Sequence, residues 1–317
     1  MNLIAASIPV RTRSLPLAFA VLFTVAAPIA AQSPTMGHGV LTEERTGVLV
    51  MAHGGSEEWN ASVRSAVDGL DAERPTTVAF GMAEPMSLTS GLARLAERGV
   101  TRVAVVRLFL SGRSFRSQTD WLLGLSDERP RWLMTRKGVD PSTVGRIPHG
   151  MTIATHDDGL MGSPHAGRIV EERVVGASLD PASESVLLIA HGMGDENENT
   201  EVIASMERIA GRLDAAGFSS VRTETLREDW KEAREIAEER IRDFVAVESD
   251  RGQRVIVVPF RLSGFGPYAK VLDGLSYEPT EGLLPHEAIT EWIADMADVV
   301  ICAQEWDGCS TDGPDER

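Results

Sequence analysis

The chain carries the same ordered pattern twice, and this internal duplication limits what it can fold into. Residues 47–55 read GVLVMAHGG and residues 185–194 read SVLLIAHGMG, so each copy is an apolar run that ends in Ala-His-Gly. A second pair follows in the same order, because residues 102–112 read RVAVVRLFLSG and residues 254–264 read RVIVVPFRLSG. Two matches in one order indicate a duplication and therefore two similar structural units.

Within each copy, short apolar runs alternate with segments of helical periodicity. The expected strands of both copies cover residues 47–52, 76–80, 102–110, 151–155, 185–190, 221–226 and 254–262. The expected helices cover residues 57–70, 86–98, 119–125, 164–174, 199–216, 230–247 and 285–297. The alternation predicts an α/β fold of two tandem lobes, each a small parallel sheet with helices on both faces, facing a cleft. We expect the lobes to span residues 47–176 and 185–300, followed by a C-terminal tail over residues 301–317.

The first 31 residues have the layout of a secretory signal. Arginines precede an apolar stretch over residues 15–27, and two small residues, Ala30 and Ala31, follow it. The stretch is short for a membrane span. We expect residues 1–31 to be cleaved on export to the periplasm or the medium, which leaves residues 32–46 as a flexible N-terminus and no stable membrane insertion. An uncleaved anchor or a mistaken start codon is the alternative.

The charge balance is strongly acidic. The chain has 31 Lys and Arg against 47 Asp and Glu, a net charge of −16. Removal of residues 1–31, which hold two arginines and no acid, would leave 29 basic side chains and a net charge of −18. Such a surface repels nucleic acid and anionic lipid, so we expect no nucleic-acid partner.

Cysteine occurs twice, as Cys302 and Cys309 near the C-terminus. Their spacing is not the CxxC spacing of many metal sites. In an exported protein, two cysteines this close can close a small disulfide loop, and we expect such a loop here.

His53 and His191 follow the first strand of their respective copies. Ligands of open parallel sheets bind beyond the carboxyl ends of the strands, where both histidines lie. A neutral imidazole binds first-row transition metals and accepts a proton near neutral pH. Acidic residues follow each histidine and can assist it or can favour a helix N-terminus. Repetition of the pattern favours a functional role for both histidines.

Three further histidines lie at the ends of expected strands or helices, and the first His-Gly-Gly segment resembles that of another enzyme class. His156 ends the fourth expected strand between a threonine and two aspartates, which makes it a further candidate metal ligand. His165 and His286 open the closing helices of the two copies, where capping is the expected role. An apolar strand ending in His-Gly-Gly also resembles the oxyanion segment of α/β-hydrolases, but the sequence has no Gly-x-Ser-x-Gly nucleophile elbow.

Four features together resemble the CbiX/SirB-type class II tetrapyrrole chelatases, the sirohydrochlorin cobalto- and ferrochelatases. They are the strand–His-Gly opening, the VAFGMAEP segment of residues 78–85, the strand of residues 102–110 and the closing Pro-His helices. The resemblance implies a cleft in which a tetrapyrrole loses two pyrrole protons while a divalent metal enters. It implies cobalt, iron or nickel as a substrate and no organic cofactor. His53 and His191 would then be the catalytic metal ligands and proton acceptors, with His156 in reserve as a metal ligand.

The sequence departs from the family pattern at two places. The family's second histidine belongs to a Gly-Gly-His segment after the third strand, but residues 111–116 read SGRSFR and residues 263–268 read SGFGPY. The carboxylate of the family's Phe-Leu-Glu segment falls near Gly81. One site can instead combine the histidines of both lobes, while Arg113 and Arg116 bind the acidic side chains of the tetrapyrrole.

Three functions are therefore compatible with the sequence. The first is an exported tetrapyrrole chelatase. The second is a non-catalytic periplasmic protein that binds a metal or a tetrapyrrole and has lost the second catalytic histidine. The third is a structural or interaction protein that keeps only the scaffold. The sequence leaves open the metal, the side-chain pattern of the tetrapyrrole and the oligomeric state.

Overall fold

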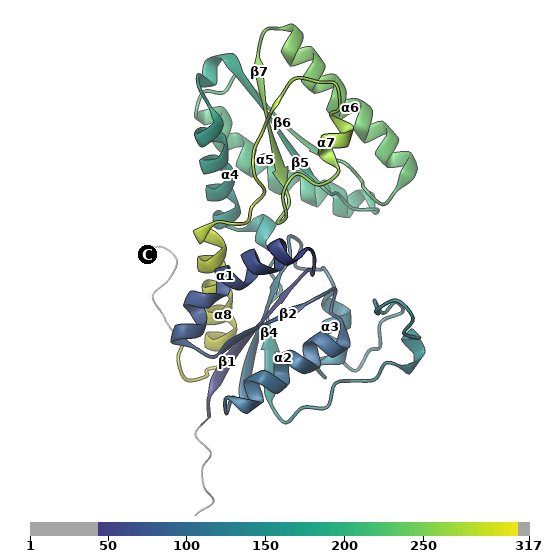
Figure 1. Ribbon diagram of the computed structural model, residues 1–317, viewed down its shortest axis with the longest axis vertical. Coiled ribbons are helices and arrows are strands. Elements are labelled where there is room, and N and C mark those ends of the chain that lie inside the picture. Colours follow the sequence, from purple (N-terminus) through teal and green to yellow (C-terminus); the bar gives the residue numbers. More distant parts are fainter. Residues whose placement is uncertain (1–43, 310–317) are drawn as a thin grey trace, which may run out of the picture. The chain divides into compact units, whose positions relative to one another are not determined.

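Two four-stranded parallel sheets organise residues 44–309, the part of the chain that this computed structural model describes (Figure 1). The first sheet has the strand order β2-β1-β3-β4 and the second the order β6-β5-β7-β8. Every pair of neighbouring strands in the two sheets is parallel. The predicted α/β fold with two similar lobes is thereby confirmed.

The elements follow the duplicated order of the sequence. The strands are β1 (Thr46–Ala52), β2 (Thr76–Phe80), β3 (Arg102–Leu108), β4 (Thr152–Thr155), β5 (Glu184–Ala190), β6 (Ser220–Thr225), β7 (Arg254–Phe260) and β8 (Glu278–Pro279). The helices are α1 (Glu57–Glu73), α2 (Pro85–Glu97), α3 (Arg116–Leu122), α4 (Pro164–Ala177), α5 (Glu196–Ala215), α6 (Lys231–Asp250), α7 (Tyr268–Val271) and α8 (Glu287–Ala303). Sequence periodicity missed α7 and β8, because four and two residues are too few to show a period.

The first strand of each copy is almost completely buried. Six of the seven residues of β1 and all seven of β5 are buried. Strands covered on both faces need such continuous apolar runs. Side-chain caps then start the helices that follow: Ser56 accepts the amide hydrogen of Trp59, and Asp195 accepts those of Asn197 and Glu198.

The closing helices are exchanged between the two sheets. Helix α4, which ends the first copy, packs against α5 and β7 of the second lobe. Helix α8, which ends the second copy, packs against α1 and β3 of the first lobe (Figure 1). An apolar helix face fits either sheet equally well, so the order of elements along the sequence does not reveal this exchange.

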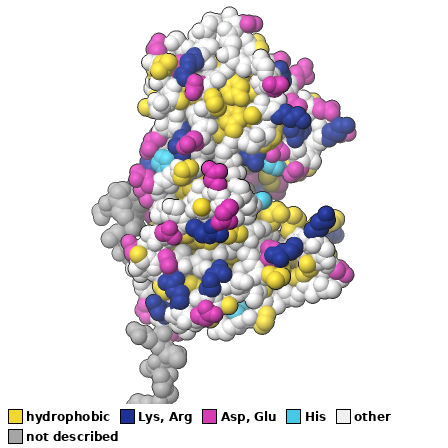
Figure 2. Space-filling model, in the orientation of Figure 1, with side chains coloured by type: hydrophobic (Ala, Val, Ile, Leu, Met, Phe, Trp, Pro, Cys, Tyr) yellow, Lys and Arg dark blue, Asp and Glu magenta, His cyan; other side chains and the backbone are white. Residues whose placement is uncertain are grey.

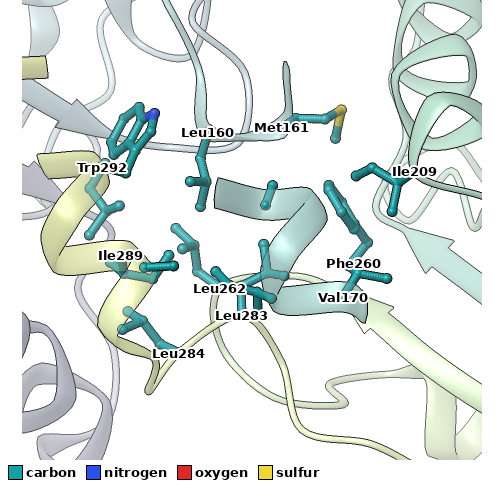
Figure 3. Close-up of a cluster of buried hydrophobic side chains, with 14 of the residues drawn as sticks. Leu160, Met161, Val170, Ile209, Phe260, Leu262, Leu283, Leu284, Ile289 and Trp292 are labelled. Carbon is teal, nitrogen blue, oxygen red and sulfur yellow. The ribbon is translucent and has the colours of Figure 1, made fainter. Parts of the chain in front are cut away.

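One hydrophobic cluster runs through both lobes. It contains buried residues of β1 and α1 together with residues of β5, β7, α4 and α8. Figure 3 shows Leu160, Val170, Phe260 and Ile289, which come from four different segments, around the same apolar centre. Because the exchanged helices and this cluster join the sheets, we expect the two lobes to unfold together.

Two backbone segments approach each other closely after β3, and another two do so after β7. A side chain on Gly159 would place its Cβ 2.3 Å from the backbone nitrogen of Gly112. A side chain on Gly282 would place its Cβ 2.7 Å from the backbone nitrogen of Gly264. Only glycine allows two backbones to approach so closely, so Gly159 and Gly282 permit these contacts with the loops beyond β3 and β7.

The C-terminal cysteines form the predicted disulfide, which joins Cys302 to Cys309. The closed loop lies on the first lobe. There the hydroxyl of Thr46 donates a hydrogen bond to the carbonyl of Asp307, and Arg74 donates one to the carbonyl of Gly308. The disulfide closes this loop, and the two hydrogen bonds hold the loop against the first lobe.

The predicted signal, residues 1–31, and most of the predicted flexible N-terminus, residues 32–46, lie outside the described residues. No helix within residues 44–309 is long and apolar enough to cross a membrane. On the face drawn in Figure 2, acidic and basic side chains are interspersed, so the charge there is spread over the surface.

Candidate functional site

His53 and His191 occupy matching positions at the carboxyl ends of β1 and β5. In each ring, Nδ1 lies 2.8 Å from the carbonyl oxygen of the next residue, Gly54 or Gly192. A carbonyl only accepts hydrogen bonds, so Nδ1 carries the proton of the neutral ring. The lone pair of Nε2 is then free in the neutral ring of His53 and can bind a metal or accept a proton. In His191 the Nε2 atom faces the carboxylate of Asp229, and these two acceptors need a proton or a cation between them.

A carboxylate stands beside His191. The Nε2 atom of His191 lies 3.3 Å from Oδ2 of Asp229, and the His191 side chain is 39% exposed. Asp229 follows β6, whose last residue, Thr225, pairs with Ala190 just before the histidine. Asp229 was not predicted from the sequence, because the expected carboxylates were those that closely follow each histidine and the one near Gly81. The available signal was an acidic pair directly after the second strand of the second copy.

Arg227 shapes the turn that brings Asp229 to His191. Its backbone is left-handed, with φ of 56°, and its side chain is 8% exposed. The guanidinium donates hydrogen bonds to both carboxylate oxygens of Glu196, at 2.9 and 3.2 Å, and to the carbonyl of Gly194 at 3.0 Å. These hydrogen bonds lower the pKa of the Glu196 carboxyl. The arginine thus connects the end of β6 to the histidine turn and to the start of α5.

The first-lobe histidine has different surroundings. His53 is exposed, and its carbonyl accepts a hydrogen bond of 2.5 Å from the indole Nε1 of Trp59. Glu57, the nearest acid in the sequence, pairs with Arg64 at 2.8 Å. Glu84 accepts the amide hydrogen of Ser87 and caps α2. Among the hydrogen bonds and ion pairs of residues 44–309, none joins a carboxylate to the His53 ring.

The predicted site that combines both histidines stays a prediction. The hydrogen bonds of the two rings, as far as the described residues go, remain within their own lobes. Within residues 44–309, no group of three or more His, Cys, Asp or Glu side chains is arranged to hold a metal ion. His191 and Asp229 form a pair of one imidazole and one carboxylate at the carboxyl edge of the second sheet.

His156 is part of the interior of the first lobe. Its ring is 5% exposed, and Nε2 accepts the backbone amide hydrogen of Arg107 at 3.2 Å. Burial, together with the charge of Arg107, lowers the pKa of His156 to about 4. Nδ1 is buried without a partner in the described part of the chain. This arrangement favours a structural role, so we leave His156 out of the proposed site, and its role as a metal ligand stays untested.

The other two predicted histidine roles differ from each other. The Nδ1 atom of His286 accepts the amide hydrogen of Ala288 and caps α8, as predicted. His165 does not cap α4, because Ser163 does so. The Nε2 atom of His165 instead lies 3.3 Å from Asp295 of α8, so this histidine helps to join the two exchanged helices.

Arg113 and Arg116 lie in the loop after β3, and both already pair with carboxylates of the chain. Arg113 reaches Glu198 at 3.5 Å and Glu201 at 3.3 Å, both on α5. Arg116 lies 2.5 Å from Asp157. Their predicted contact with the acidic groups of a tetrapyrrole stays a prediction, and it requires the ligand to displace these partners.

A cavity of about 470 Å³ adjoins the second histidine turn. Met193, two residues after His191, lines it together with Arg113, Glu198 and Trp292. A larger cavity of about 850 Å³ lies along β2 of the first lobe and includes Phe80, Gly81 and Arg94. The smaller cavity is the one in contact with the turn that carries the His191–Asp229 pair.

Comparison with known proteins supports this architecture. Residues 47–117 match the protein family described as CbiX. No curated protein is a significant match to the sequence. The fold is similar to that of SirB from Bacillus subtilis with Fe³⁺, with a TM-score of 0.58 and 14% identity, over 82% of this chain and 98% of that chain.

Two further solved structures are similar. SirB from Bacillus subtilis subspecies spizizenii, a sirohydrochlorin chelatase in complex with cobalt, has a TM-score of 0.52 and 13% identity, over 80% of this chain and 94% of that chain. DR2241 from Deinococcus radiodurans, a multi-domain protein with structural similarity to chelatases, has a TM-score of 0.51 and 19% identity over 80% of this chain. This chain spans only 54% of the Deinococcus protein. The predicted resemblance to the CbiX-type chelatases is confirmed over residues 47–117, and the likeness of fold extends over both lobes.

Proposed function

We propose that this chain, with a CbiX-type first lobe and a chelatase-like fold, is an exported tetrapyrrole metal chelatase. It would insert divalent cobalt, iron or nickel into a sirohydrochlorin-like macrocycle without an organic cofactor. The observation that carries the proposal is the His191–Asp229 pair at the carboxyl edge of the second sheet. In this proposal His191 is the metal ligand and proton acceptor, and Asp229 assists it.

The spacing of the pair suits a metal that must be released again. First-row ions bind imidazole nitrogen and carboxylate oxygen at about 2.0–2.2 Å. An ion at that distance from both Nε2 and Oδ2 fits atoms that lie 3.3 Å apart. Two protein ligands leave the other coordination positions open to the macrocycle nitrogens. The chain therefore holds the ion weakly, as transfer requires.

Insertion also releases two protons from the pyrrole nitrogens. The Nε2 atom of His191 has a single lone pair, so it cannot hold the ion and accept a proton at the same time. Once the ion has passed to the macrocycle, the lone pair that it leaves can accept a pyrrole proton. A carboxylate at 3.3 Å stabilises the imidazolium that then forms. Because the side chain is 39% exposed, it can pass each proton to solvent before it accepts the next.

Two observations support export of the protein. The N-terminal sequence has the layout of a secretory signal. The chain also forms a disulfide between Cys302 and Cys309, and such bonds persist in oxidising compartments. We therefore propose the periplasm or the medium as the place of action.

A binding protein for a metal or a tetrapyrrole is the second candidate. The observation that favours it is the absence of histidine from residues 111–116 and 263–268, where the family has its second catalytic histidine. A site with one imidazole, that of His191, and one carboxylate can bind a ligand without completing insertion.

Mixing the purified protein with sirohydrochlorin and Co²⁺, and following the absorbance of the product, tests the proposal. We expect a rate above that of the protein-free mixture and a loss of about 10- to 100-fold in Asp229→Asn, which keeps the size of the side chain but not its charge. The exposed neighbour variant Lys231→Gln is the control. A spectral shift on binding without turnover would favour the binding protein. If neither turnover nor a spectral shift is observed, only the structural or interaction function remains.

A further inference from the structure

Trp230 is an exposed aromatic ring next to the His191–Asp229 pair. The side chain is 37% exposed, although tryptophan is usually well covered. Its ring centroid lies 6.0 Å from that of His191, and the two ring planes are perpendicular, at 90°. An exposed indole at the edge of a sheet where ligands bind is a candidate contact surface.

The backbone around Trp230 holds the ring in a defined place. A side chain on Gly194 would place its Cβ 2.3 Å from the indole Nε1, so the glycine backbone lies directly against the ring. The amide of Trp230 donates a hydrogen bond to the carbonyl of Arg227 at 3.0 Å. Because the turn fixes this ring before any ligand arrives, little freedom is lost on binding.

The other indoles near the histidines are used differently. Trp59 donates its Nε1 hydrogen to the carbonyl of His53 and supports the first-lobe turn. Trp292 is 1% exposed and belongs to the core. No hydrogen bond among the described residues uses Nε1 of Trp230, so neither the core nor a hydrogen bond accounts for its position.

We propose that the flat face of the macrocycle stacks on the indole ring of Trp230. The ligand that this site binds would then be a planar, conjugated ring system. This inference rests on the proposed function. The lone pair of Nε2 lies in the plane of the imidazole. It can therefore point at the flat face of a macrocycle, along the perpendicular to that face, only when the imidazole plane is perpendicular to the macrocycle plane. A macrocycle parallel to the indole meets this condition, because His191 already stands at 90° to Trp230.

The direct test is the dissociation constant of metal-free sirohydrochlorin, measured by absorbance titration of the full chain. We expect Trp230→Ala to weaken binding about tenfold or more, as loss of a stacking platform does, and Trp230→Phe to stay within about threefold of the unchanged protein. Trp230→Leu, which is apolar but not flat, should resemble the alanine variant. Trp132→Ala is the matched control, because Trp132 is 87% exposed in a loop of the first lobe.

The outcomes separate this inference from the proposed function. Unchanged affinity in folded Trp230→Ala or Trp230→Leu, or an equal loss in Trp132→Ala, would overturn the stacking role even if metal insertion is observed. A selective loss of affinity in the Trp230 variants would support the role even if the protein inserts no metal. Circular dichroism of each variant identifies any that do not fold, and Trp230→Phe against Trp230→Leu then decides the question.

Discussion

The two histidine turns have matching sequences and different surroundings. Both rings keep the same hydrogen bond from Nδ1, and in both turns a glycine backbone lies against an indole. Of these two rings, only that of His191 has an ion-pair contact with a carboxylate of the described residues, Asp229 at 3.3 Å. The duplication therefore preserved the backbone of the turn and the hydrogen bond of the imidazole, whereas the carboxylate beside the ring belongs to one copy.

The two lobes also place their polar residues differently. Position 107 of the first copy is an arginine that is 1% exposed, and the matching position of the second copy is Pro259. Burial lowers the pKa of Arg107, whose guanidinium donates hydrogen bonds to the carbonyls of Gly112 and His156. The first lobe thus uses its buried polar groups to hold its own loops together.

Replacement of Arg227 should have the largest effect on stability. Arg227→Ala removes the hydrogen bonds to Gly194 and Glu196 and keeps the left-handed backbone, so we expect a loss of about 3 kcal/mol in the free energy of unfolding. Arg227→Gly loses the same hydrogen bonds but suits a φ of 56°, so it should lose less. Urea unfolding measures both variants. Equal stability of Arg227→Ala and the unchanged protein would contradict the role of Arg227 in the second-lobe turn.

The buried histidine of the first lobe, His156, should make the free energy of unfolding depend on pH. His156 has a pKa of about 4 in the folded chain against 6.5 when unfolded, so between these values the unfolded state binds more protons. Stability is then complete above pH 6.5 and falls with pH toward 4. At pH 5 the loss is about 2 kcal/mol relative to pH 7.5. Urea unfolding at both pH values should show a smaller loss in His156→Gln, whose amide oxygen can still accept the hydrogen of Arg107. An equal slope in both proteins would refute this assignment.

A matched pair of glycine variants compares the two turns directly. In Gly194→Ala the new Cβ collides with Trp230, at 2.3 Å, and in Gly55→Ala it collides with Trp59, at 2.5 Å. We expect about a tenfold loss of insertion rate for Gly194→Ala, because the displaced indole lies beside His191, and about a twofold loss for Gly55→Ala. Initial rates of cobalt insertion measure both. Greater sensitivity at Gly55 would assign the chemistry to the first lobe.

The features that occur in both copies could be predicted from the sequence, whereas the helix exchange and the contact of Asp229 with His191 could not. Apolar runs before His53 and His191 predicted the strands and their carboxyl-end histidines, because a buried parallel strand needs such a run. The exchange of α4 and α8 depends on which sheet each apolar helix face meets, and no local pattern records that. The contact of Asp229 with His191 depends on a left-handed residue at position 227, and an arginine does not mark this conformation in a sequence.

If the chemistry of insertion belongs to the second lobe, the single variants His191→Ala and His53→Ala should differ sharply. Both are assayed side by side for cobalt insertion into sirohydrochlorin, after circular dichroism shows that they are folded. We predict a loss of at least about 100-fold for His191→Ala and a change within about threefold for His53→Ala. Equal losses would contradict this account and favour a site shared by both lobes, and an unchanged rate in His191→Ala would remove His191 from the reaction.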